Sequence, residues 1–443
     1  MAPGLHSLIE RARFLWRERR DMLAGLLDSG SASLATFAVG IYAVRVLDPT
    51  LLGGYALAYQ ATFLVGLVPS NLVFVPVEIR VVAYPRRLRL GHLNRALWLG
   101  ALPALISALA VVVWVPIAPP EIPAEAIRAL TLTGVATAAL SPVQDHVRRM
   151  LHSGGLSWGA AAVSAVQLVV AAAALGFLHA SGIPAIWIPF GALAVANLCS
   201  LALGVAWARR GASPLPAGEA SYRFMDLARS GSWLLGGGVL NPASGFVAAA
   251  IVSRLASAAA LGYAEAARVV AQPIWVLAVG LSSVMGPQSM EAAGAGRRAR
   301  ARDARRAFLW PILGVGALTL AWLGPDWTLN PLAWLLPSAY AVEGLVAASI
   351  VAQTLAATIF PYRSELLGAR KESTFTRIEI LGAVARLAVS ATASFVRAFA
   401  IPLGILAVWA VRWIGVRRAL RPVYETDRSE SGRAPEAVGR ESA

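Results

Sequence analysis

The chain has 443 residues, of which 57% are hydrophobic and 14% are charged. Soluble globular domains are about 45–50% apolar and about 25% charged, so the composition disfavours a water-soluble enzyme and excludes disorder over most of the chain. The formal net charge of +15 raises nucleic acid as a partner until the basic residues are placed. The single cysteine, Cys199, excludes an intrachain disulfide and a cysteine-based metal cluster.

Twelve apolar stretches are long enough to cross the hydrocarbon core of a bilayer, which takes about 20 residues. The stretches are continuous rather than alternating, which predicts helices instead of barrel strands. We therefore expect an all-α polytopic membrane protein. The predicted spans are 22–47, 55–79, 97–117, 127–147, 156–178, 186–207, 233–255, 263–285, 304–323, 340–360, 375–395 and 399–416.

The basic residues give an orientation to these spans. With the N-terminus inside, all but six of the 39 Lys and Arg residues fall in the tails and in the loops on one side. Positive residues close to a span stay in the cytoplasm, so this pattern predicts a multi-pass protein of the cytoplasmic (inner) membrane with both termini cytoplasmic. The net charge is then a topology signal facing anionic membrane lipids, and no nucleic-acid partner is expected.

The halves of the chain repeat one another. Arg45 closes the first span and Gly54-Tyr55 opens the second, while Arg254 and Gly262-Tyr263 do the same at the seventh and eighth, with one residue fewer between them. Six spans per copy is an even number, so both copies point the same way, as parallel repeats do in transporters. We expect two six-helix lobes around a central cleft.

The predicted organisation has five parts. They are a cytoplasmic or interfacial N-terminal helix (1–21), an N-lobe (22–208), a cytoplasmic linker (209–224), a C-lobe (225–418) and a disordered cytoplasmic tail (419–443). Apolar residues at helical spacing place the first part flat in the inner interface, although it serves equally as a lead-in to the first span.

Six short segments stand out along the chain: LDS at 27–29, RVLDP at 45–49, GYALA at 54–58, VPVE at 75–78, QDHVRRMLHSGG at 144–155 and MGPQSME at 285–291. These segments resemble bacterial polysaccharide-export proteins, the lipid-linked oligosaccharide flippases of the multidrug/oligosaccharidyl-lipid/polysaccharide (MOP) superfamily. The resemblance implies a substrate, a polyprenyl-pyrophosphate-linked glycan moved from the inner to the outer leaflet. It also implies a polysaccharide polymerase and glycosyltransferases as partners.

Charged side chains within spans mark function, because each costs at least about 2.5–3.5 kcal/mol at mid-depth. Arg268 and Arg386 are the candidate substrate-binding cations, with a buried bridge to Glu265 or Glu379 as the alternative. Arg45 and Arg254 are further candidates, although a cap that reaches the interface explains each of them as well.

Acidic residues are the candidate ion-coupling sites. Glu343 has no cationic neighbour in its predicted span, Glu265 lies beside Arg268, and Asp28 lies near the inner end of the first span. The five histidines are scattered, and the single lysine, Lys371, is not part of a phosphate-binding loop. We expect no metal and no cofactor.

Three functions fit this sequence to different degrees. The first is a flippase for a lipid-linked oligosaccharide or polysaccharide precursor, working by alternating access and driven by an ion gradient or the membrane potential. The second is a cation-coupled multidrug exporter on the same scaffold, which needs a cleft dominated by acids. The third, a membrane-embedded glycosyl- or acyltransferase, needs catalytic acids on sizeable outer loops, and the outer loops here are short.

Overall fold

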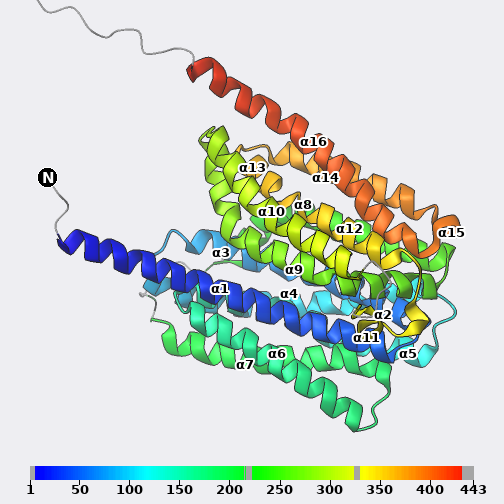
Figure 1. Cartoon of the computed structure of the whole chain (residues 1–443). Coiled ribbons are helices and arrows are strands. Elements are labelled where there is room, and N and C mark those ends of the chain that lie inside the picture. Colours follow the sequence, from blue (N-terminus) through cyan, green and yellow to red (C-terminus); the bar gives the residue numbers. More distant parts are fainter. Residues whose placement is uncertain (1–4, 214, 216–221, 324–329, 432–443) are drawn as a thin grey trace, which may run out of the picture.

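The computed structural model describes the chain except for residues 1–4, 214, 216–221, 324–329 and 432–443. The described residues form helices and connecting turns without a strand, which confirms the all-α prediction (Figure 1). The N-terminal half consists of α1 (Leu5–Val46), α2 (Pro49–Pro69), η1 (Ser70–Phe74), α3 (Val75–Val81), α4 (Arg86–Leu109), η2 (Ala110–Ile117), α5 (Ala124–Ser153), α6 (Ser157–Ala180), η3 (Ala185–Trp187) and α7 (Ile188–Gly211).

The C-terminal half has the same plan with more interruptions. Its elements are α8 (Phe224–Leu255), α9 (Ala258–Gly294), α10 (Arg298–Leu323), α11 (Leu332–Leu335), η4 (Ser338–Tyr340), α12 (Leu345–Ala357), α13 (Phe360–Gly368), α14 (Glu372–Ser390), α15 (Ala393–Val396), η5 (Arg397–Phe399) and α16 (Ala400–Ser431). The protein is a two-lobe polytopic membrane protein, with α1–α7 forming the N-lobe and α8–α16 the C-lobe.

Eleven helical segments in the described part of the chain are long and apolar enough to cross a membrane. Each of them overlaps one of the twelve predicted spans. The remaining predicted span, 375–395, corresponds to α14, which is not among these eleven segments. This helix carries Glu379 and Arg386, and it lies against α8 and α16 inside the C-lobe. Its charges therefore lie among neighbouring helices.

The two ends of the chain compare differently with the prediction. The helix α1 continues from Leu5 to Val46 without a break, so the predicted N-terminal helix runs directly into the first span, as its alternative as a lead-in expects. The last helix, α16, extends to Ser431, so the beginning of the predicted tail is helical. Residues 432–443 lie outside the described residues.

A π-helical turn interrupts the second span between α2 and α3. Pro76 lacks the N–H that would bond to Leu72, and its ring displaces that carbonyl, so the ladder widens at η1. Side chains then satisfy nearby backbone groups, because Ser70 Oγ donates to Gly66 O at 3.0 Å and Asn71 Nδ2 donates to Leu67 O at 2.9 Å. The interruption places Asn71 next to α8 of the C-lobe, where a Cβ atom on Gly238 would lie 3.4 Å from Asn71 Oδ1.

The two ends of the bundle are packed differently. We call the end where α1 begins and α16 ends the basic end, and the other the opposite end. Toward the opposite end, one core cluster combines both lobes, with Leu52 and Leu57 packed together with Leu261 and Ile350. Toward the basic end there are two smaller clusters: one consists of N-lobe residues together with Leu227 of α8, and the other of C-lobe residues alone.

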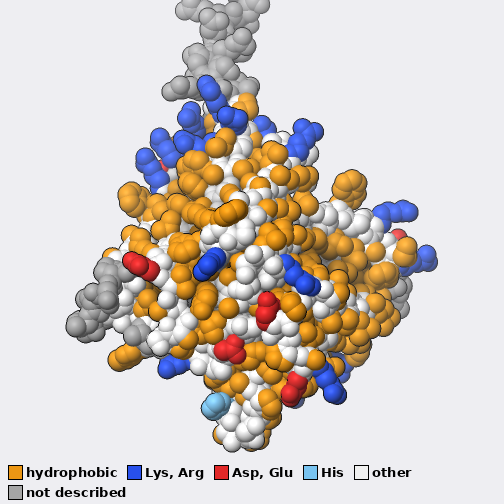
Figure 2. Space-filling model, turned by 90° about the vertical axis from the view of Figure 1, so that its right-hand side faces the viewer, with side chains coloured by type: hydrophobic (Ala, Val, Ile, Leu, Met, Phe, Trp, Pro, Cys, Tyr) orange, Lys and Arg blue, Asp and Glu red, His pale blue; other side chains and the backbone are white. Residues whose placement is uncertain are grey.

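Much of the outer surface is apolar. Figure 2, which faces the right-hand side of Figure 1, shows hydrophobic side chains over most of that view, with a group of basic side chains at the top. Trp98, Leu102 and Phe177 are each more than 60% exposed. Apolar faces of this extent are stable next to lipid rather than water.

Candidate functional site

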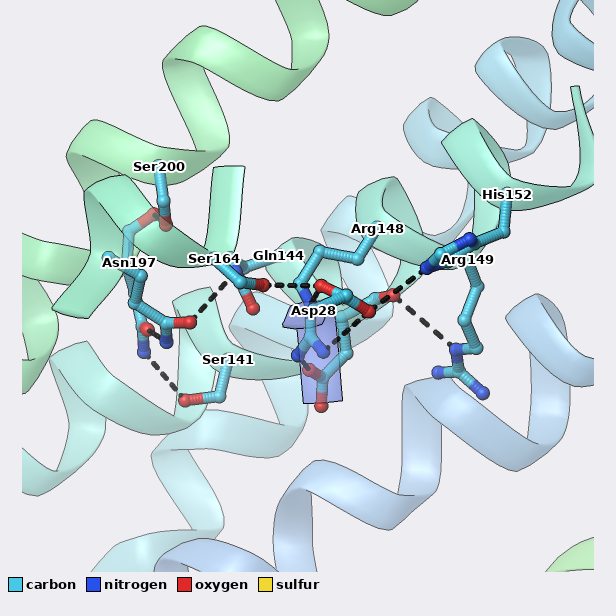
Figure 3. Close-up of polar contacts among 11 residues, drawn as sticks. Asp28, Ser141, Gln144, Arg148, Arg149, His152, Ser164, Asn197 and Ser200 are labelled. Carbon is cyan, nitrogen blue, oxygen red and sulfur yellow. Dashed lines mark hydrogen bonds and ion pairs between the residues drawn. The ribbon is translucent and has the colours of Figure 1, made fainter. Parts of the chain in front are cut away.

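The N-lobe holds a buried carboxylate, Asp28 of α1, at the centre of a polar cluster (Figure 3). Arg148 of α5 binds both of its oxygens, with Nε 2.8 Å from Oδ1 and Nη2 2.9 Å from Oδ2. His152, one turn further along α5, lies 3.0 Å from Oδ2 through Nε2, and Ser164 of α6 donates to Oδ1 at 2.5 Å. Three helices are joined through this one side chain.

A second set of polar side chains lies next to this cluster (Figure 3). Gln144 donates to Gln167 at 3.3 Å, Gln167 donates to Asn197 at 2.7 Å, and Asn197 donates to Ser141 at 2.9 Å. Four helical residues thus satisfy one another inside the N-lobe, as buried polar groups must.

The Asp28 carboxylate has all of its near partners supplied by the protein. Two guanidinium N–H groups, a hydroxyl and an imidazole nitrogen surround its two oxygens. A metal cation would have to displace Arg148 in order to bind there. In this arrangement the acid serves as an intramolecular ion-pair partner, and ion coupling at Asp28 remains a prediction.

The C-lobe holds a cation in a different setting. Arg386 of α14 donates through Nη1 to the carbonyl of Asn241 (3.0 Å) and to Ser244 Oγ (3.1 Å), and through Nη2 to Asn241 Oδ1 (2.9 Å). Its Nε is buried without a hydrogen-bond partner. Among the described residues no carboxylate lies within ion-pair distance of it, because Glu379 instead pairs with Arg412 of α16 at 2.5 Å. Arg386 therefore does not pair with Glu379, but it does bridge α14 to α8 through neutral groups.

Arg386 also lies near the boundary between the lobes. A Cβ atom on Gly245 of α8 would be 3.2 Å from Arg386 Nη1 and 3.7 Å from the amide oxygen of Gln60, which belongs to α2 of the N-lobe. Earlier on α8, Gly236 and Gly237 face open space. Neutral polar groups from both lobes thus lie beside an uncompensated guanidinium.

The other predicted cation, Arg268, is neutralised within its own helix. It donates to Glu265 through Nε at 2.7 Å and through Nη2 at 2.6 Å, and its guanidinium lies 6.0 Å from the ring centre of Tyr59. The pairing predicted from the i, i+3 spacing is confirmed. Arg268 and Glu265 act together as a buried bridge within the shared core, which leaves neither charge free.

Three further candidates lie at the opposite end. Arg45 donates to the carbonyl of Trp334, and Arg254 donates to the carbonyls of Pro116 and Ile117, in each case across to the other lobe. Glu343 is exposed in the turn that precedes α12, so its predicted place inside the tenth span is wrong. Gly344, in the left-handed conformation at a φ of 72°, delays the start of that helix by several residues.

A pocket of about 730 Å³ also opens at the opposite end, between the α8–α9 turn and the α15–α16 connection. Tyr263, Phe395, Arg397 and Phe399 are among its lining residues. Its lining residues all belong to the C-lobe, and neither Asp28 nor Arg386 is among them. No three His, Cys, Asp or Glu side chains of the described residues are grouped to hold a metal.

The partners of Asp28 were not predicted. Arg148 pairs with Asp145 at the i, i+3 spacing of one helix, at 3.0 Å, and the same arginine also binds Asp28 on another helix. Polar residues in otherwise apolar spans, such as Ser164 and Gln167, were the available signal, because such residues in a membrane find a partner or a function.

Comparison with known proteins adds a fold relationship. No family model matches the chain, and no curated protein sequence matches it. Among solved structures, it is similar to an inward-facing multidrug resistance MATE family transporter of the MOP superfamily, with a TM-score of 0.69 and 12% identity, over 90% of this chain and 96% of that one.

Two further structures are similar. One is a mutant of the Vibrio cholerae MATE transporter VcmN, with a TM-score of 0.60 and 13% identity, over 94% of this chain and 99% of that one. The other is a MOP superfamily transporter from Pyrococcus furiosus, described as having a binding pocket of reverse polarity, with a TM-score of 0.62 and 14% identity, over 94% and 95%. At these identities the comparisons establish the fold, that of MATE transporters.

Proposed function

We propose that this protein is a flippase that moves a lipid-linked oligosaccharide or polysaccharide precursor across the cytoplasmic membrane by alternating access. The observation that carries the proposal is Arg386, a guanidinium inside the C-lobe whose partners are all neutral. A charge in that position calls for an anion, and a substrate linked through pyrophosphate provides one.

The surroundings of Arg386 favour a transient anionic ligand over a permanent protein partner. Removing an ion from water costs several kcal/mol unless another charge compensates it. The nearest acid, Glu379, is already paired with Arg412, and Asn241 supplies only neutral oxygens. A pyrophosphate group would gain a charge-assisted hydrogen bond from a cation that its binding site already holds in place.

The packing of the lobes supports alternating access. The lobes share a large core toward the opposite end, while toward the basic end the C-lobe meets the N-lobe cluster only through α8, with Leu227 in the core and Arg80 bonded to Asp226 and Ser230. With the basic end in the cytoplasm, as the arginine pattern predicts, this arrangement corresponds to a state that receives substrate from the inner leaflet. Glycosyltransferases acting on that leaflet would supply the substrate, and a polymerase on the other side would consume the product.

A cation-coupled multidrug exporter is the second candidate. It is favoured by the similarity to multidrug resistance MATE transporters and by the presence of a buried acid, Asp28, in the N-lobe. Such an exporter needs an acid that is free to bind a cationic drug or a coupling ion. Here Arg148 forms an ion pair with Asp28, and Arg268 forms one with Glu265. Neither acid is therefore free to bind a cationic drug or a coupling ion.

A transport assay with matched variants tests the proposal. Proteoliposomes containing a fluorescent polyprenyl-pyrophosphate-linked sugar report the fraction of lipid in each leaflet, and a parallel assay measures efflux of a cationic dye. We expect Arg386→Gln to slow the lipid at least about tenfold, with partial recovery in Arg386→Lys, since the lost interaction is a charge-assisted hydrogen bond. The control is Arg377→Gln, an exposed arginine on the same helix as Arg386.

The outcomes separate the two functions. Flipping of the anionic lipid that depends on Arg386, without dye efflux, supports the proposal. Dye efflux that is unaffected by Arg386→Gln, together with no movement of the lipid, would overturn it in favour of the multidrug exporter. In cells, deletion of the gene should trap the lipid-linked oligosaccharide on the inner leaflet, and unchanged outward labelling of that lipid would contradict the proposal.

A further inference from the structure

Two arginines at equivalent places in the repeat each reach across to the other lobe. Arg45 lies at the end of α1, and its Nη1 donates to the carbonyl of Trp334 in the C-lobe at 2.9 Å. Arg254 lies at the end of α8, and donates to Pro116 O at 2.9 Å and to Ile117 O at 3.1 Å in the N-lobe. The two interactions form a reciprocal pair, one donated by each lobe.

The same pseudo-symmetry governs the crossing of α2 and α9 just beyond these arginines. A Cβ atom on Gly53 would lie 1.9 Å from the carbonyl oxygen of Ala258, and one on Gly262 would lie 1.9 Å from the carbonyl oxygen of Pro49. Each glycine stands eight residues after its arginine, so the structural repeat has no gap here, unlike the alignment expected from the sequence. The backbones touch because neither position has a side chain.

The turns that lead into this crossing are equivalent as well. Asp48 caps α2 by accepting from the N–H groups of Thr50 and Leu51, and Ser257 caps α9 by accepting from the N–H of Ala260. These caps fix where each helix begins, and so fix the path of the chain between each arginine and the point of closest contact.

A third bond between the lobes lies inside this region. The hydroxyl of Tyr340, in η4 of the C-lobe, donates to the carbonyl of Leu47 at 2.7 Å, and the tyrosine is only 3% exposed. Every one of these three interactions ends on a backbone carbonyl of the other lobe. They therefore depend on the relative position of the lobes rather than on a complementary side chain.

We propose that Arg45, Arg254, Tyr340 and the Gly53–Gly262 crossing form the gate that holds the opposite end closed in this state of the protein. Closure requires the two glycines because the backbones meet there. The arginine and tyrosine bonds then stabilise the closed position and break when the lobes part. The inference rests on the proposed alternating-access transport, but it is independent of the substrate.

The gate can be tested by measuring the distance between the lobes. Spin labels are attached to cysteines introduced at Glu125 of the N-lobe and Thr392 of the C-lobe, both exposed at the opposite end, with Cys199 replaced by Ser. Pulsed electron–electron double resonance on the full-length protein in lipid nanodiscs then reports the closed and open populations. The measurement needs no substrate.

The glycine arm tests the crossing. Gly53→Ala places a methyl group against the backbone carbonyl of Ala258, so we expect the distance distribution to shift almost entirely to longer values. The matched control is Gly66→Ala on the same helix, where a Cβ would meet nothing within 4 Å. A distribution for Gly53→Ala identical to that of the control would overturn the proposal.

A second set of variants tests the arginine bonds, and it keeps the proposal testable if the glycine variant fails to fold. Arg254→Gln loses two bonds on an exposed surface, so we expect the open-to-closed ratio to rise about five- to tenfold, with a similar rise for Arg45→Gln. The control is Arg128→Gln, another exposed arginine at this end. Unchanged ratios in both gate variants would refute the role of the arginines. If the unsubstituted protein opens and closes this gate but fails to flip the lipid, the proposed function is contradicted while the gate proposal stands.

Discussion

The Asp28–Arg148 pair gives the sharpest test of the energetics of the N-lobe. The side chain of Asp28 is 6% exposed and that of Arg148 is 14% exposed, so solvent screens neither charge strongly. Asp28→Asn keeps the shape of the side chain but leaves the guanidinium without its buried counter-charge. Breaking a buried pair from one side costs about 3–5 kcal/mol. We expect the free energy of unfolding to fall by about 3 kcal/mol, the lower end of this range, because Arg148 retains its contact with Asp145.

The second step of the test is a double-mutant cycle. Arg148→Gln alone leaves Asp28 with only Ser164 and His152 as partners, so it should destabilise the protein by a similar amount. The double variant Asp28→Asn, Arg148→Gln replaces both charges by neutral amides. It should lose about 2 kcal/mol less than the sum of the single variants, since residues in one ion pair are strongly coupled.

The assay is thermal unfolding of the purified protein in detergent, followed by the fluorescence of its 14 tryptophans. Asp145→Asn is the control, because Asp145 is 54% exposed and an exposed ion pair contributes about 1 kcal/mol or less. If Asp28→Asn loses no more than this control, or if the two single changes simply add, the ion pair does not stabilise the N-lobe.

Three other changes have defined outcomes. Glu265→Gln should lower stability by about 3 kcal/mol in the same unfolding assay, because it leaves a buried guanidinium unpaired, and a loss below about 1 kcal/mol would show that the bridge is dispensable. Gly100→Ala would place a Cβ 2.1 Å from the ring of Phe74 and should cost about 1–3 kcal/mol through overpacking; an unchanged melting temperature would contradict it. Burial raises the pKa of the Tyr340 hydroxyl above its usual value, so its bond to Leu47, fully formed below about pH 10, should persist through mildly alkaline pH. The distance between the spin labels at Glu125 and Thr392 should then be the same at pH 7 and pH 9. A longer distance at pH 9 would refute the expectation that the Tyr340 hydroxyl keeps its proton at that pH.

Most of the fold followed from the sequence because lipid simplifies the problem. A stretch of about 20 apolar residues has few alternatives to a helix in a bilayer, so eleven predicted spans match described helices. The exception, α14, shows where this logic weakens: Glu379 pairs with Arg412 of α16 and Arg386 donates to neutral oxygens of α8, contacts that a hydropathy argument from the sequence does not see.

The candidate site was harder to predict because charge pairing between helices depends on contacts that sequence spacing does not encode. The pair of Arg268 with Glu265 lies within one helix, and the spacing predicted it. Asp28 and Arg148 are 120 residues apart, and only the packing of α1 against α6 and α5 against α6 brings their helices together. The predicted position of Glu343 inside a span was wrong for a local reason, because the turn at Gly344 delays the start of α12.

The two lobes differ in how their buried charges are balanced, and this difference is the basis on which we propose a flippase rather than a drug exporter. In the N-lobe the protein supplies its own cation to the buried acid, so Asp28 and Arg148 together add no net charge. In the C-lobe Glu379 forms an ion pair with Arg412, so the positive charge of Arg386 has no acidic partner among the described residues. A drug exporter for cations would have to reverse this balance, whereas a carrier of pyrophosphate-linked lipid needs one positive group that is already desolvated and held in place. The sign of the unpaired charge is therefore a stronger guide to the substrate than the fold, which both kinds of transporter share.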